Sequence, residues 1–111
     1  MKHLFVYGTL CPGQPNEHIL KRIGGTWQAG HVRGRLYPNG WGAALGYPGI
    51  VLGEDGDVVE GYIFTSDQLE DNISDLDRFE GPGYRRVLTT IELRDKTQIA
   101  AYIYELSQTP G

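Results

Sequence analysis

The chain has 111 residues, 14 acidic and 10 basic side chains, and a formal net charge of -4 at pH 7. This length predicts a single domain, residues 1–111, with a core that needs no disulfide, and the lone Cys11 cannot form one within the chain. The composition excludes a disordered or fibrous protein, and an acidic chain without a Lys/Arg cluster argues against a nucleic-acid partner.

The apolar segments and the N-terminus bear on location. The longest apolar runs are far shorter than the roughly 20 residues of a membrane-spanning helix. The N-terminus carries neither the hydrophobic region nor the cleavage site of a secretory signal. We therefore expect a soluble cytoplasmic protein with no membrane partner.

Apolar and alternating segments, separated by turn residues, predict six strands and two helices. Residues 3–7 form an apolar run, and residues 26–37 alternate between apolar and polar side chains, as half-buried strands do. In chain order the predicted elements are a strand at 3–7, a short helix that starts near Pro15 and stops at Gly24, strands at 26–37, 47–52 and 58–65, a helix at 66–80, and strands at 84–93 and 98–106.

The order of these elements predicts an α+β fold. Two helices are too few for a doubly wound sheet, which needs a helical crossover for each parallel pair of strands. The 16 glycines are scattered along the chain, and such glycines are typical of tight turns and bulges in a strongly bent sheet. We expect a small, mixed, β-barrel-like sheet flanked by two helices.

The helix predicted at 66–80 contains an acid on its apolar face. At about 100° per residue, Leu69, Ile73 and Leu76 fall near 0°, 40° and 340°, and Glu80 falls near 20°. Glu80 therefore points toward the apolar stripe, in the last turn of the helix. Burial and the negative end of the helix dipole both raise the pKa of a carboxyl group there, toward the range that suits proton transfer. An ion pair of Glu80 with Arg85 or Arg86, or a frayed helix end, remains the alternative.

The turn after the first strand, Tyr7 to Leu10, is the second candidate. Gly8 followed by Thr9 can direct consecutive backbone N–H groups into one concavity, which suits a carboxylate or an oxyanion. A plain turn is the alternative. Nucleotide binding is disfavoured because Gln14 and Pro15 stand where a P-loop requires Lys and Ser or Thr.

The remaining residues with metal-binding chemistry are dispersed. His3, His18, His31 and Cys11 lack the close paired spacings of metal sites. We therefore expect no metal. Tyr84 follows Glu80 by four residues across a turn, and we expect its ring to line the same pocket.

Two motifs, FVYGTL at 5–10 and LDRFEGPGYRR at 76–86, resemble the γ-glutamylcyclotransferase-like family, also called AIG2-like. YPGIV at 47–51, VEGYIF at 59–64 and AYIYEL at 101–106 extend the resemblance over almost the whole chain. It implies a small mixed barrel flanked by helices, in agreement with the predicted elements.

The resemblance also implies an activity. Active members of the family release 5-oxoproline from γ-glutamyl compounds, with one glutamate that matches Glu80. Their substrate-binding loop matches Tyr7, Gly8, Thr9 and Leu10. The expected partner is a small γ-glutamyl substrate, and no cofactor is required. The segment that starts at Trp41 does not align with the pattern, which leaves the departing amine open. The competing hypothesis is a non-catalytic module that binds a small amino-acid-like ligand, with a scaffold role third.

Overall fold

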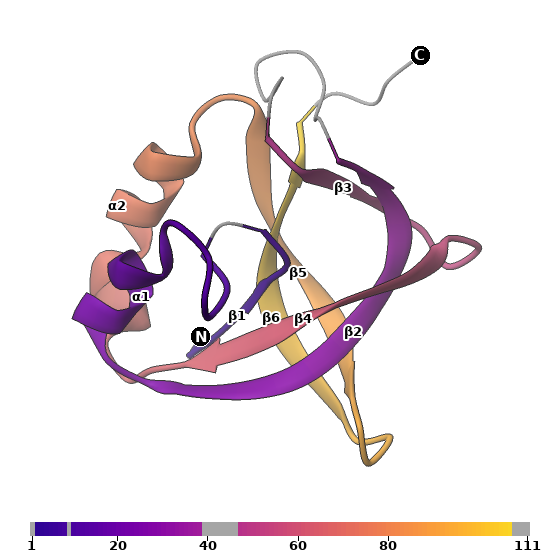
Figure 1. Cartoon of the computed structure of the whole chain (residues 1–111), viewed down its shortest axis with the longest axis horizontal. Helices are drawn as coiled ribbons and strands as arrows, with labels where there is room; N and C mark the ends of the chain where they lie inside the picture. Colours follow the sequence, from indigo (N-terminus) through magenta and orange to yellow (C-terminus); the bar gives the residue numbers. More distant parts are fainter. Residues whose placement is uncertain (1, 9, 39–46, 108–111) are drawn as a thin grey trace.

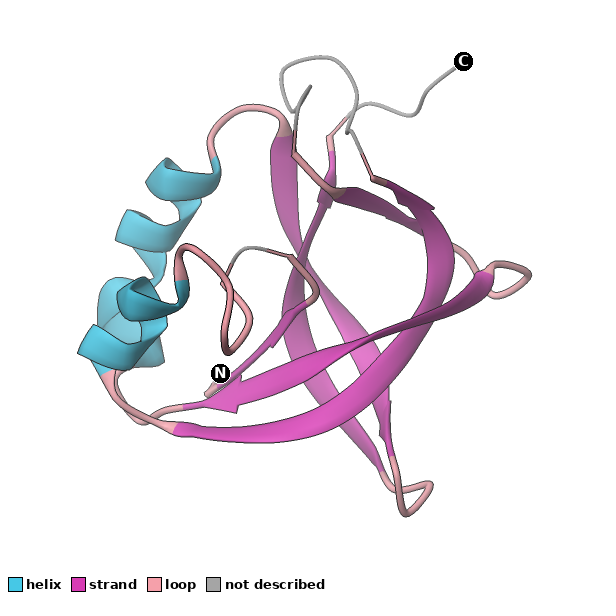
Figure 2. Cartoon of the chain, in the orientation of Figure 1, coloured by secondary structure: helices cyan, strands magenta, loops and turns pink. Residues whose placement is uncertain are grey.

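The computed structural model describes residues 2–8, 10–38 and 47–107, and its chain forms a curved sheet with two helices on one side (Figures 1 and 2). None of the helices in this part of the chain is long and apolar enough to cross a membrane. The elements are β1 (His3–Val6), α1 (Glu17–Ile23), β2 (Thr26–Tyr37), β3 (Gly49–Leu52), β4 (Asp57–Thr65), α2 (Leu69–Glu80), β5 (Tyr84–Leu93) and β6 (Gln98–Leu106).

The sheet closes on itself. Its strand order is β3-β2-β4-β1-β6-β5, and an additional pairing of β2 with β5 joins the ends of a five-stranded barrel, with β3 as a sixth strand on β2. β1 and β6 are parallel, and the other pairs are antiparallel. The prediction of a mixed, barrel-like α+β fold with two flanking helices is confirmed.

Alternation along the strands divides the apolar side chains between two core clusters. In β1, Phe5 packs with Ile63 and Ile103 in the cluster that fills the barrel. Its neighbours Leu4 and Val6 belong to the second cluster, which also contains residues of both helices. Because successive side chains of a strand point to opposite faces, β1 packs against both the barrel interior and the helices. The end of β1 therefore lies at the boundary between the two clusters.

The helices begin later than the sequence predicts. The predicted start of the second helix at Ser66 is wrong by three residues, because the Ser66 hydroxyl donates to the Gly24 carbonyl and accepts from the Gln68 backbone N–H. This hydrogen bonding makes a turn ahead of α2. The first helix begins at Glu17 after two successive turns, closed by Gln14 N–H to the Cys11 carbonyl and Glu17 N–H to the Gln14 carbonyl.

Gly61→Ala is expected to lower the free energy of unfolding by about 2 to 3 kcal/mol. A Cβ at Gly61 would lie 2.2 Å from the Val6 carbonyl oxygen, so the β1–β4 pair would have to separate. Gly53→Ala is the matched control, because a Cβ at Gly53 meets nothing within 4 Å. Urea unfolding of both variants checks this prediction, and equal losses of stability would contradict it.

Candidate active site

Glu80 is the last residue of α2, and the packing of that helix determines where its side chain points. Leu69, Ile73 and Leu76 are buried, as the periodicity predicts. The helix ends at Gly81, which has a φ of 79° and donates its N–H to the Asp77 carbonyl at 3.0 Å. A left-handed φ is readily adopted by glycine, so the chain reverses directly after Glu80.

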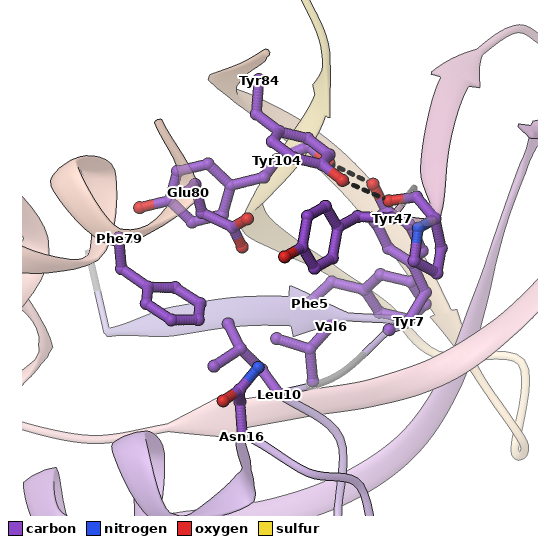
Figure 3. A pocket seen from close by; sticks show the side chains of 12 residues that line it. Phe5, Val6, Tyr7, Leu10, Asn16, Tyr47, Phe79, Glu80, Tyr84 and Tyr104 are labelled. Atoms are coloured by element: carbon purple, nitrogen blue, oxygen red, sulfur yellow. Dashed lines mark hydrogen bonds between the residues drawn. The ribbon is translucent and has the colours of Figure 1, made fainter. Parts of the chain in front are cut away.

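The Glu80 side chain points into a cavity of about 380 Å³ (Figure 3). In Figure 3, Tyr84 and Tyr104 lie on one side of the carboxylate, with Val6 and Leu10 on the other. The cavity lies where the end of β1, the end of α2 and the first residues of β5 meet. Its lining residues are Phe5, Val6, Tyr7, Gly8, Leu10, Asn16, Tyr47, Pro48, Phe79, Glu80, Tyr84 and Tyr104.

The structure brings most of the candidate site residues from the sequence together. Tyr7, Gly8, Leu10, Glu80 and Tyr84 all line this one cavity. Thr9 lies outside the described residues, as does the unaligned segment at 41–45.

Burial raises the pKa of Glu80 from its ordinary 4.5 to about 7. The two arginines of the ion-pair alternative have other partners: Arg85 binds Glu105 at 2.8 Å, and Arg86 binds Asp77 at 2.9 Å. Among residues 2–8, 10–38 and 47–107, no ion pair includes Glu80. Because burial raises its pKa and no cation among the described residues pairs with it, both protonation states of Glu80 are populated near neutral pH.

Two tyrosine hydroxyls bind backbone groups of the segment at 48–50, whose Pro48 lines the cavity. The Tyr7 hydroxyl donates to the Tyr104 carbonyl at 2.6 Å and accepts from the Ile50 N–H at 3.2 Å. The Tyr84 hydroxyl donates to the Pro48 carbonyl. Burial, and secondarily the charge of Glu80, raises the pKa of Tyr84 to about 12, so this phenol keeps its proton at neutral pH.

Tyr7→Phe is expected to lower the free energy of unfolding by about 1 to 3 kcal/mol, because it leaves the partly buried Ile50 N–H and Tyr104 carbonyl without their partner. Tyr62→Phe is the control, since Tyr62 is 38% exposed. Chemical denaturation of the two variants provides the comparison. A Tyr7→Phe protein as stable as the Tyr62→Phe protein would show that the Tyr7 hydroxyl does not stabilise the contact between Ile50 and Tyr104.

Seven lining residues were not among the predicted site residues: Phe5, Val6, Asn16, Tyr47, Pro48, Phe79 and Tyr104. Phe79 is 46% exposed. It directly precedes Glu80 in the sequence, and this position was the signal that could have placed Phe79 at the site. Tyr104 lies in β6 and is 95% buried in the cluster shared with the helices. No periodicity in the sequence places Asn16 or Tyr47 beside Glu80, because both belong to turns.

These groups limit what the site can do chemically. A partly buried carboxylate with a pKa of about 7 can both accept and donate a proton at neutral pH. The cavity suits a small ligand of mixed polar and apolar character. Within the described ranges, no group of three or more His, Cys, Asp or Glu side chains is placed to hold a metal ion.

Comparison with known proteins supplies relatives for this arrangement. A γ-L-glutamyl-butirosin B γ-glutamyl cyclotransferase from Niallia circulans is 33% identical over 88 residues, which are 79% of this chain and 53% of that protein. The chain thus spans about half the length of this curated relative.

Solved structures share the fold. YkqA from Bacillus subtilis matches with a TM-score of 0.73 and 28% identity, over 97% of this chain and 36% of YkqA. An AIG2-like protein from Mus musculus matches with a TM-score of 0.73 and 22% identity, over 99% of this chain and 80% of that one. The model of the family described as γ-glutamyl cyclotransferase, AIG2-like, matches residues 4–111. Since this match covers nearly the whole sequence, the chain belongs to the γ-glutamyl cyclotransferase, AIG2-like family.

Proposed function

We propose that this protein is a γ-glutamylcyclotransferase-type enzyme, which converts a γ-glutamyl amide into 5-oxoproline and releases the amine. The observation that carries the proposal is Glu80, a carboxyl group with a pKa of about 7 that points into a cavity of about 380 Å³. Membership of the family and the name of the relative from Niallia circulans support the same reaction class.

The nucleophile of this reaction belongs to the substrate. The α-amine of a γ-glutamyl group attacks its own γ-carbonyl carbon and closes a five-membered ring. Because both reacting groups are in one molecule, the protein mainly has to hold the substrate chain in its folded conformation. The rings of Tyr7 and Tyr84 line the cavity and restrict the conformations that fit.

Glu80 has the properties of the proton carrier. Its carboxylate takes a proton from the α-ammonium, which frees the nitrogen lone pair for attack. Its acid form then gives that proton to the nitrogen of the scissile amide as the C–N bond breaks. The ring nitrogen of 5-oxoproline keeps one of the three ammonium protons, and the other two must reach the departing amine, which leaves as an ammonium ion. Glu80 can carry these two protons one after the other, because each delivery restores its carboxylate.

The backbone at Gly8 and Leu10 is proposed to bind an oxygen anion of the substrate, either the α-carboxylate or the oxyanion of the tetrahedral intermediate. Both residues line the cavity. Cys11 N–H donates to the Gly8 carbonyl at 3.1 Å, and this hydrogen bond closes the turn. A Cβ at Gly8 would lie 3.9 Å from Pro48, an ordinary van der Waals distance, so Gly8 and Pro48 lie close together at the cavity.

The competing role is a pocket that binds an amino-acid-like ligand without converting it. A pure binder gains nothing from a partly buried carboxylate that has no ion-pair partner within the described part of the chain, because burial of the charge costs free energy. This consideration favours the enzyme.

The test is incubation with a panel of γ-glutamyl amides, including γ-glutamyl amino acids, γ-glutamyl-ε-lysine and glutathione, and mass-spectrometric detection of 5-oxoproline. At least one member should give 5-oxoproline and free amine in equal amounts. If the whole panel yields no product above background while calorimetry detects binding, the protein is a binding module.

A further inference from the structure

A cluster of three side chains beside the cavity joins the end of α2 to β5 and β6. Asp77, one turn before Glu80, accepts two hydrogen bonds from Arg86 of β5, at 2.9 and 3.2 Å. The same carboxylate accepts a third from the Tyr104 hydroxyl of β6, at 2.7 Å. The Arg86 guanidinium also lies 4.5 Å from the centre of the Tyr102 ring.

This cluster extends into the walls of the cavity. The Tyr104 carbonyl accepts from the Tyr7 hydroxyl, and that hydroxyl accepts from the Ile50 N–H. The main chain of Asp77 takes part as well, because its carbonyl accepts the N–H of Gly81 that ends the helix. Asp77 therefore binds both the end of α2, through its carbonyl, and β6, through the Tyr104 hydroxyl. The Tyr104 carbonyl in turn binds Tyr7, whose hydroxyl also binds Ile50.

Resting on the proposed function, we propose that Asp77 is a positioning residue for Glu80. Its three side-chain hydrogen bonds hold the last turn of α2 so that the Glu80 carboxyl group stays in the cavity. Arg86 has a second effect, because it neutralises a carboxylate that lies one helical turn from the proton carrier.

Stability alone does not explain the geometry of this cluster. The Asp77 side chain is 42% exposed, and ion pairs with that much solvent contact contribute little to the free energy of unfolding. A bidentate pair completed by a phenol nevertheless fixes orientation well. Variants of Asp77 and Arg86 should consequently fold and report on Glu80.

Removal of the Arg86 charge and removal of the Asp77 charge should shift the pKa of Glu80 in opposite directions. Arg86→Gln leaves Asp77 negative and uncompensated, so the pKa of Glu80 should rise by roughly half a unit. Asp77→Asn leaves Arg86 positive, so the pKa should fall by a similar amount. Both shifts should grow at low ionic strength.

Other charged or titratable groups that face the cavity are left unchanged in this comparison. They come from the turn after β1, the segment before β3, β5 and β6, and they are Tyr7, Tyr47, Tyr84 and Tyr104. The matched control is the exposed pair Asp75 and Arg78 on the same helix, joined at 3.5 Å. Asp75→Asn and Arg78→Gln remove the same charges from the solvent side of α2.

The experiment is a ¹³C NMR titration of the glutamate side-chain carboxyl groups, with the Glu80 signal assigned from Glu80→Gln, alongside kcat measurements. The double variant Asp77→Asn/Arg86→Gln should recover a pKa near that of the wild type, yet kcat should stay about tenfold or more below it because position is lost.

The NMR titration needs no turnover. Opposite shifts in a protein that makes no 5-oxoproline would support the electrostatic link and reject the proposed function. Shifts in the same direction, no shifts, or equal shifts in the Asp75 and Arg78 controls would overturn the link between Asp77 and Glu80. A double variant with the kcat of the wild type would overturn the positioning role.

Discussion

Glu80→Gln is expected to lower kcat by roughly 10²- to 10⁴-fold, the usual contribution of a general acid–base group. Glutamine keeps the volume of the side chain and most of its hydrogen-bonding capacity, but it cannot carry a proton. Ligand affinity should change little, because binding is assigned to the tyrosine rings and to the turn at Gly8 and Leu10. Turnover of the best panel substrate and calorimetry with a non-reactive γ-glutamyl analogue measure the two effects separately.

A second acid at the end of a helix provides the control for this substitution. Glu70 lies in the first turn of the same helix and is exposed, so Glu70→Gln removes an identical group outside the cavity. Its kcat should match that of the wild type. If Glu80→Gln keeps full turnover, or loses turnover only because it unfolds, Glu80 does not carry the proton.

The dependence of turnover on pH should show the same group. Glu80 must be a carboxylate to accept the first proton, so kcat/KM should rise about tenfold per pH unit at low pH and bend near the Glu80 pKa of about 7. At high pH the substrate amine loses its own proton and can no longer charge Glu80, so the profile should level or fall. Affinity for the non-reactive analogue should depend less steeply on pH over the acid limb. Equally steep curves would mean that Glu80 only anchors the ammonium group.

The raised pKa has a consequence for stability whose sign can be worked out. Folding raises the pKa of Glu80 from 4.5 to about 7, so the folded state binds more protons than the unfolded state between these values. The contribution of Glu80 to the free energy of unfolding is most favourable below pH 4.5 and becomes less favourable as pH rises toward 7, by at most about 3 kcal/mol. Solvent contact of the partly buried carboxyl group makes the change smaller than this limit.

The difference between wild type and Glu80→Gln isolates this effect. Carboxyl groups with a lowered pKa, such as Asp77, affect both proteins alike, and their stabilising contribution is lost as the solution becomes acidic. Relative to the wild type, the Gln variant should therefore be more stable at pH 8 than at pH 4. A stability difference that does not vary with pH would show that the pKa of Glu80 is not raised.

Much of the fold could be predicted because local patterns determine the elements. The strands at 26–37, 84–93 and 98–106 have the predicted boundaries, since alternation and turn residues mark both ends. The start of α2 was missed because the hydrogen bond from Ser66 to Gly24 joins residues 42 positions apart. The pairing of β2 with β5 that closes the barrel depends on accumulated strand twist, which no local pattern encodes.

The candidate site divides in the same way. Helical periodicity was enough to direct Glu80 toward the apolar face, because its position depends on one helix. The partners of Arg85 and Arg86 could not be predicted, since Asp77 and Glu105 are acids on different elements. Tyr104 belongs to the site through contacts with α2 and with the turn after β1, which only the assembled barrel brings together.

The most direct test of the central claim is the fate of a γ-glutamyl amide in H₂¹⁸O, with mass spectrometry of all products. Ring closure by the substrate's own amine takes no oxygen from water. The wild type should therefore release 5-oxoproline without ¹⁸O and an equal amount of amine, and Glu80→Gln should release neither at a comparable rate. Glutamate that carries ¹⁸O would identify a hydrolase, and unlabelled 5-oxoproline formed equally fast by both proteins would contradict the role of Glu80.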